Sequence, residues 1–167
     1  MIARAAAAML ALAALDGLAA GTPEGGTFTV KSITPEAALK AAKGALEKCR
    51  AEGFQVTVAI VDRSGVTLAL IRDRYASPGS VDVAQRKAQT AVNFRMDTAA
   101  LDRELQPGRP TAGIRNQPGV AAIAGGVPIE ASGALVGAIG VSGAPGPAND
   151  DLCAREGLKA ITEDLEF

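Results

Sequence analysis

The chain has 167 residues, 48% of them hydrophobic and only 3% aromatic, with a formal net charge of -1 and no histidine. This length predicts one domain with a core of Ala, Val, Leu and Ile, and the near-neutral charge excludes the electrostatic signature of a nucleic-acid-binding protein. The absence of histidine excludes His-based metal sites, a Ser-His-Asp triad and a Cys-His dyad, so acid–base chemistry depends on carboxylates, Lys, Tyr, Cys or a bound cofactor.

Residues 1–21 predict a secretory signal peptide, because one arginine precedes an Ala/Leu run that ends in small residues. Asp16 interrupts the run, so an Ala-rich helix that belongs to the fold stays an alternative. The run is too short and too interrupted for a stable membrane span. Residues 22–33 are predicted to be a linker and residues 34–167 the domain, in a protein that is periplasmic or secreted.

The first element of the domain is a predicted helix over residues 34–53, with Thr34 as its N-cap and Gly53 as its stop signal. Apolar residues at helical spacing predict a buried stripe, formed by Leu39, Ala42, Leu46 and Cys49.

A hairpin follows, with strands 56–61 and 66–71 around a turn at residues 62–65. Because both strands are nearly all apolar, we expect a sheet covered on both faces. Residues 77–94 predict a second helix with a small-residue face suited to close packing, formed by Val81, Ala84, Ala88 and Ala91.

The segment 97–110 contains a short predicted helix, and residues 111–143 return to strand composition, interrupted by glycine-rich turns that leave two or three strands. A final helix is expected over about residues 151–163, with Asn149 or Asp150 as its N-cap. Its inner face carries Cys153, Gly157 and Ile161.

This order of elements predicts an α/β/α sandwich in which the terminal helices cover one face of an antiparallel sheet and the middle helices cover the other. If the terminal helices are neighbours, Cys49 and Cys153 can meet and form a disulfide, as an oxidising compartment allows. Two buried free thiols are the alternative.

Four stretches together resemble one known family: VDRSGVTLALIRD, AQRKAQTA, PGVAAIAGGVPI and GALVGAIGVSGA followed by an acidic helix start. They are similar to the GlcG/HbpS-like family of haem-binding and so-called haem-degrading proteins, and to the C-terminal part of PduO-type cobalamin adenosyltransferases. The resemblance covers residues 34–162. It implies a profilin-like α/β/α sandwich with a central, mostly antiparallel five-stranded sheet, assembly into homo-oligomers, and haem or another tetrapyrrole as ligand.

The resemblance raises the question of an iron ligand, because the histidine described for one family member has no counterpart here. Tyr75 is the only tyrosine, and a tyrosinate can bind ferric haem. Met96 is a weaker axial candidate. Arginines that would bind the propionates are Arg72 with Arg109 or Arg115.

Each of these charged residues also has a structural interpretation. Asp73 either orients Arg72 or acts as a general base, or the two form an ordinary exposed ion pair. Lys87 is either a cation in a pocket or part of a solvated helix face. Arg109 and Arg115 flank a Pro/Gly-rich loop that either folds over a ligand or is a solvated connector.

The glycine-rich stretch from Gly133 to Gly143 is read as a strand that permits close approach. The close approach has three possible purposes: a flat pocket floor, a subunit contact or tight helix–sheet packing. Packing is favoured for Gly137 and Gly140. Gly125 and Gly126 are interpreted as a backbone turn.

Three functions are compatible with these observations. The first is an exported, oligomeric haem-binding or tetrapyrrole-binding protein. The second is an enzyme on small organic acids, with Arg72 binding a carboxylate and Asp73 or Lys87 moving protons. The third is an accessory structural oligomer without a ligand. The absence of histidine favours the second and third, and export favours the first and third.

Overall fold

A computed structural model describes residues 25–165, so the predicted signal peptide lies outside the described residues. Residues 25–30 are exposed and carry no helix or strand. Of the described residues, 31–165 form one compact unit. Ile33, at the end of the expected linker, is buried and its N–H donates to the carbonyl oxygen of Val136 at 3.0 Å, so this unit includes the last residues of that segment.

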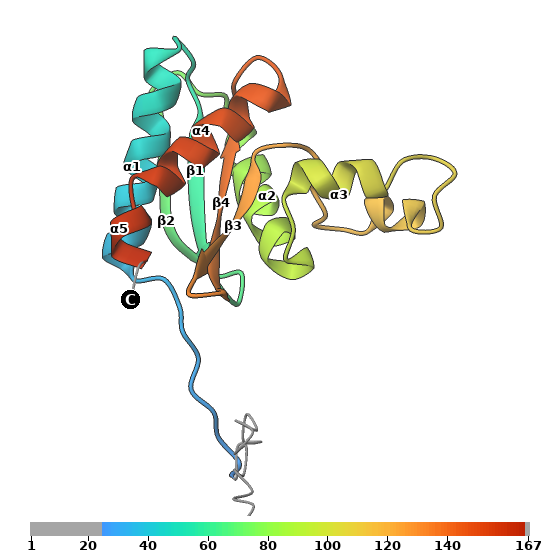
Figure 1. The fold of residues 1–167 in the computed structure, drawn as a ribbon. Coiled ribbons are helices and arrows are strands. Elements are labelled where there is room, and N and C mark those ends of the chain that lie inside the picture. Colours follow the sequence, from blue (N-terminus) through green and yellow to red (C-terminus); the bar gives the residue numbers. More distant parts are fainter. Residues whose placement is uncertain (1–24, 166–167) are drawn as a thin grey trace, which may run out of the picture. The chain divides into compact units, whose positions relative to one another are not determined.

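In the described chain, two pairs of consecutive strands form one sheet that helices flank (Figure 1). In order, the elements are α1 (Pro35–Ala51), β1 (Thr57–Asp62), β2 (Thr67–Arg72), α2 (Ser80–Phe94), α3 (Thr98–Glu104), a 3-10 helix η1 (Ala112–Asn116), β3 (Gly126–Ala131), β4 (Ala134–Ser142), α4 (Pro147–Lys159) and α5 (Thr162–Leu165). The sheet is antiparallel throughout, in the order β2-β1-β4-β3.

The sheet of the described chain therefore has four strands, and the prediction of five was wrong. Residues 119–124 do not pair with a strand, because threonine side chains of α2 and α3 bind their backbone instead. Thr90 Oγ1 accepts from the N–H of Ala121 at 2.9 Å, and Thr98 Oγ1 donates to the carbonyl oxygen of Ile123 at 2.7 Å. The likeness to profilin stays a prediction.

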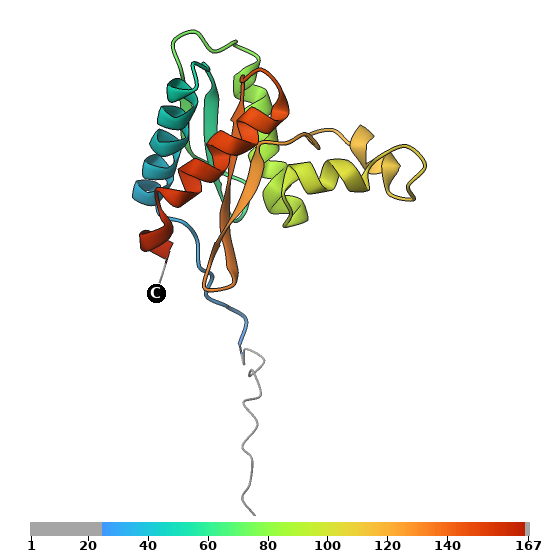
Figure 2. The ribbon, with the colours of Figure 1, turned by 45° about the horizontal axis from the view of Figure 1, so that its top comes forward.

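The layers agree with the predicted α/β/α sandwich, except that of the middle helices only α2 covers the sheet, while α3 extends away from it. α1 and α4 pack together on one face of the sheet, and α2 packs on β1, β4 and β3 from the other (Figures 1 and 2). The neighbouring helices α1 and α4 are joined by a disulfide between Cys49 and Cys153, whose Cα atoms are 5.5 Å apart. The predicted pairing of the cysteines is thus confirmed.

Three local predictions need correction. Leu39 is exposed, and Ala38 takes its place on the buried stripe of α1. The second hairpin strand is not fully covered on both faces: α2 packs mainly on the other three strands and reaches β2 through a hydrogen bond from Gln85 to Thr67 at 3.2 Å, so Leu70 stays 38% exposed. Helix α4 begins at Pro147, so Asp150 lies in its first turn and is not its N-cap.

Glycine lets α2 approach the sheet closely. A Cβ atom at Gly140 on β4 would collide with the carbonyl oxygen of Ala84 and lie 2.7 Å from the backbone nitrogen of Ala88. At Gly137 it would lie 2.5 Å from the carbonyl oxygen of Val61 and 2.9 Å from Ile33. The helix–sheet packing interpretation is confirmed for Gly140, whereas Gly137 makes room for the backbone of β1 and for Ile33, which precedes α1.

We expect Gly140→Ala to lower the free energy of unfolding by about 3 kcal/mol, because the new methyl group displaces the rigid backbone of α2. The matched control is Gly79→Ala at the start of α2, where a Cβ atom meets nothing within 4 Å. Urea denaturation of both variants measures the difference. Equal stability of the two variants would contradict the packing account.

Candidate functional site

The segment that follows β2 presents a phenol and several guanidinium groups at the surface. Tyr75 is 81% exposed, so its hydroxyl is accessible to a ligand. Arg72, the last residue of β2, reaches over the turn, and its Nη1 donates to the carbonyl oxygen of Ala76 at 2.6 Å. This bond holds the turn that carries Tyr75 against the end of the strand.

Asp73 lies within this segment but is buried, at 2% exposure. Its carboxylate accepts two hydrogen bonds from Arg50 at the end of α1, at 2.8 and 2.9 Å, and one from the N–H of Arg74 at 2.8 Å. The hydrogen bonds from Arg50 hold the pKa of Asp73 down at about 2. The prediction that Asp73 orients Arg72 was therefore wrong, since its partner is Arg50.

Lys87 points inward from α2 and is 1% exposed, so the solvated-face interpretation was wrong. Its Nζ donates to Asp150 Oδ2 at 2.7 Å and to the carbonyl oxygen of Val141 at 2.9 Å. Burial lowers the pKa of Lys87 and raises the pKa of Asp150, while the attraction between the two charges opposes both shifts. Removing one partner of such a pair costs about 3–5 kcal/mol.

Gly125 makes room for this buried pair. A Cβ atom at Gly125 would lie 2.7 Å from Asp150 Cβ and 3.0 Å from Lys87 Nζ, and the residue has φ +114. The turn interpretation of Gly125 is confirmed. Asp150 also accepts from the N–H of Ala144 at 2.9 Å, so the pair fixes the loop between β4 and α4.

Arg109 and Arg115 belong to the segment beyond α3, which projects away from the sheet (Figures 1 and 2). Arg109 pairs with Glu104 at 3.1 Å and Arg115 with Asp102 at 2.6 Å, and all four side chains are about half exposed. The structure does not bring these two arginines beside Tyr75, which follows β2 at the other edge of the sheet.

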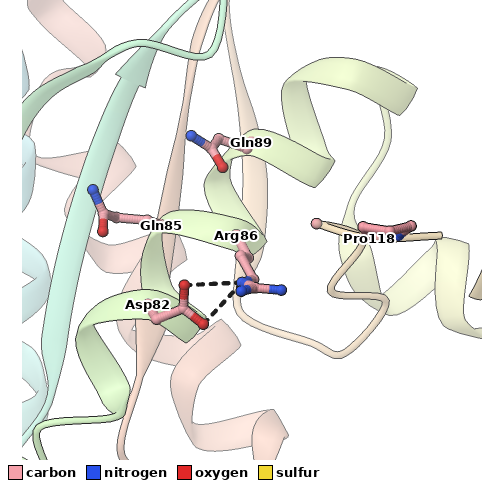
Figure 3. A pocket seen from close by; sticks show the side chains of 6 residues that line it. Asp82, Gln85, Arg86, Gln89 and Pro118 are labelled. Atoms are coloured by element: carbon pink, nitrogen blue, oxygen red, sulfur yellow. Dashed lines mark hydrogen bonds and ion pairs between the residues drawn. The ribbon is translucent and has the colours of Figure 1, made fainter. Parts of the chain in front are cut away.

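A polar groove, which the sequence analysis missed, runs along the outer surface of α2 (Figure 3). Its larger part has a volume of about 510 Å³ and is lined by Asp82, Gln85, Arg86, Gln89, Pro118 and Gly119. A neighbouring part of about 260 Å³ shares three of these residues and adds Ser64, Gly65, Thr90, Asn93 and Val120. We call these two parts together the α2 groove.

The described residues contain no group of three Cys, Asp or Glu side chains placed to bind a metal ion. Within the same part of the chain, no helix has the length and apolar character needed to cross a membrane.

The pKa of Asp73 predicts a dependence of stability on pH. Because the pKa in the folded protein is about 2, below its ordinary value of 3.8, ionised Asp73 stabilises the fold above about pH 4. This contribution is lost as the pH falls toward 2. We expect Asp73→Asn to be less stable at neutral pH and to show a smaller loss between pH 4 and 2 in chemical denaturation. Parallel pH profiles of the two proteins would contradict the assignment.

A family model described as "Haem degrading protein HbpS-like" matches residues 33–159. Among curated relatives, an uncharacterized 15.0 kDa protein from the dhaT-dhaS intergenic region of Citrobacter freundii is 32% identical over 136 residues, which cover 80% of this chain and 95% of that protein.

Two solved structures are also similar. A double mutant of HbpS from Streptomyces reticuli is 39% identical, with a TM-score of 0.77 over 84% of this chain and 95% of that chain. The PduOC:Heme complex is 28% identical, with a TM-score of 0.75 over 78% of this chain and 96% of that chain. These matches cover most of the sequence, and the chain belongs to the HbpS-like family.

Proposed function

We propose that this protein is an exported, oligomeric protein that binds haem or a related tetrapyrrole, with Tyr75 as the iron ligand. Family membership supports a haem-related function, and the similar PduOC structure is a complex with haem. The single observation that carries the proposed site is the exposure of the Tyr75 phenol beside a cluster of arginines.

The charges of this cluster suit the propionates of haem. Arg50, Arg72 and Arg74 contribute three positive charges, and Asp73, ionised at neutral pH, contributes one negative charge, which leaves a net charge of +2. Asp73 holds Arg50, whereas Arg72 uses only Nη1 in its bond to Ala76. Arg72 and Arg74 are therefore the residues we assign to the propionates.

An apolar surface lies on the same strand. Leu70 and Arg72 are two residues apart on β2 and so share one face, which α2 contacts at Thr67 and which stays exposed at Leu70. We propose that the ring of the tetrapyrrole packs on Leu70 while its propionates contact the arginines. Bound there, the haem would supply a ferric iron centre that the phenolate of Tyr75 ligates.

Arg109 and Arg115 would contact the haem only if the protein forms a homo-oligomer. Both lie on the segment that projects beyond α3, so in a homo-oligomer they would reach a propionate of a neighbouring subunit. Assembly would also cover β2, which lies at an edge of the sheet.

The enzyme alternative has less support. A carboxylate with a pKa of about 2 is a weak general base at neutral pH, and Lys87 is buried in its pair with Asp150. The ligand-free oligomer stays the second candidate, because the exposed Leu70 on the edge strand β2 would serve a subunit contact equally well.

The proposal predicts that the purified protein gives a saturable Soret shift with hemin. Tyr75→Phe keeps the ring and removes the ligating oxygen, so we expect it to abolish the shift. Arg72→Ala should weaken binding about tenfold, the effect of one lost charge-assisted hydrogen bond. Absorbance titration measures both.

The control is Arg103→Ala, which removes an exposed arginine from α3. It should bind hemin like the unaltered protein. A weak, non-saturating shift, or a shift unchanged by Tyr75→Phe, would overturn the proposed site.

A further inference from the structure

Hydrogen bonds to side chains of α2 hold the two segments that flank the α2 groove. On one side, Gln89 Nε2 donates to the carbonyl oxygen of Gly65 at 3.2 Å and so holds the β1–β2 turn. On the other side, Thr90 Oγ1 accepts from the N–H of Ala121 and holds the segment that carries Pro118 and Gly119. The groove is therefore present in the protein before any ligand binds.

The side chains along the groove retain hydrogen-bonding capacity. Arg86 uses its Nε for Asp82, and its Nη groups have no partner in the described part of the chain. The side-chain oxygen of Gln89 and the amide of Asn93 likewise have no partner within residues 25–165. Figure 3 shows Arg86 directed toward Pro118, with Gln85 and Gln89 on the opposite side of the helix surface.

The charges of the groove balance. Among the described residues that line it, only Asp82 and Arg86 are charged, and they pair with each other at 2.8 Å. A ligand that carries net charge would meet an opposing charge as well as a matching one. The groove therefore favours an uncharged ligand.

The hydrogen-bonding groups that line the groove suit a ligand that carries hydroxyl groups. The amide side chains present both donors and an acceptor, and the guanidinium group of Arg86 presents donors, which together suit neighbouring hydroxyls that both donate and accept. The apolar side chains of the lining are Pro118 and Val120, too few to enclose a tetrapyrrole ring. We propose that the α2 groove binds a neutral polyhydroxylated molecule, a sugar or sugar alcohol.

This site is separate from the proposed haem site. It shares no residue with the cluster at Tyr75, and its test needs no hemin. Failure of hemin binding would leave the groove proposal standing, and the reverse also holds.

The test follows backbone amide shifts of the haem-free protein by NMR. Glycerol, myo-inositol, D-glucose and sucrose are titrated at millimolar concentrations, with gluconate as the charged comparison. We expect saturable shifts at residues 64–65, 82–93 and 119–120 with at least one neutral compound. Gln89→Leu and Arg86→Met should each weaken this binding about tenfold or more.

The matched controls are Gln106→Leu and Arg103→Met, which remove the same groups from exposed positions outside the groove. Both should bind like the unaltered protein. The proposal is overturned if no neutral compound gives saturable shifts in the groove, if gluconate binds there and the neutral compounds do not, or if the controls weaken binding as much as the groove variants.

Discussion

The approach of the α2 backbone to the sheet at two glycines determines where the polar side chains of α2 lie. Gly140 on β4 leaves room for the carbonyl oxygen of Ala84, and Gly126 on β3 leaves room for that of Lys87, which a Cβ atom would approach to 2.5 Å. At this separation the side chain of Lys87 reaches Asp150 and the end of β4. The opposite surface of α2 is left exposed, and it forms the groove.

On the other face of the sheet, glycine likewise permits a close approach, here between α1 and α4. A Cβ atom at Gly157 would lie 2.6 Å from the carbonyl oxygen of Ala41, so glycine permits the helix contact in which Cys49 and Cys153 form their disulfide. Arg50 follows Cys49 directly and binds Asp73. The disulfide therefore fixes the end of α1. Arg50 at this end anchors the segment that carries Tyr75, so it links the packed core to the exposed tyrosine.

Local signals in the sequence predicted much of this fold. Thr34 caps α1 by accepting from the N–H of Ala37, and helical spacing placed both cysteines on buried faces. Of the two or three strands expected within residues 111–143, only β3 and β4 form, because threonines of α2 and α3 bind the backbone of the segment that precedes β3. The partners of Asp73 and Lys87 are 23 and 63 residues away, so no local pattern could identify Arg50 or Asp150. The α2 groove depends on segments brought together only by the tertiary fold.

The account rests most on Tyr75 as the iron ligand in a chain without histidine, which resonance Raman spectroscopy of the hemin complex tests directly. The account predicts an iron–phenolate stretching band in the unaltered protein that is absent from Tyr75→Phe. Saturable hemin binding without such a band would contradict it, because the iron would then be held by another group.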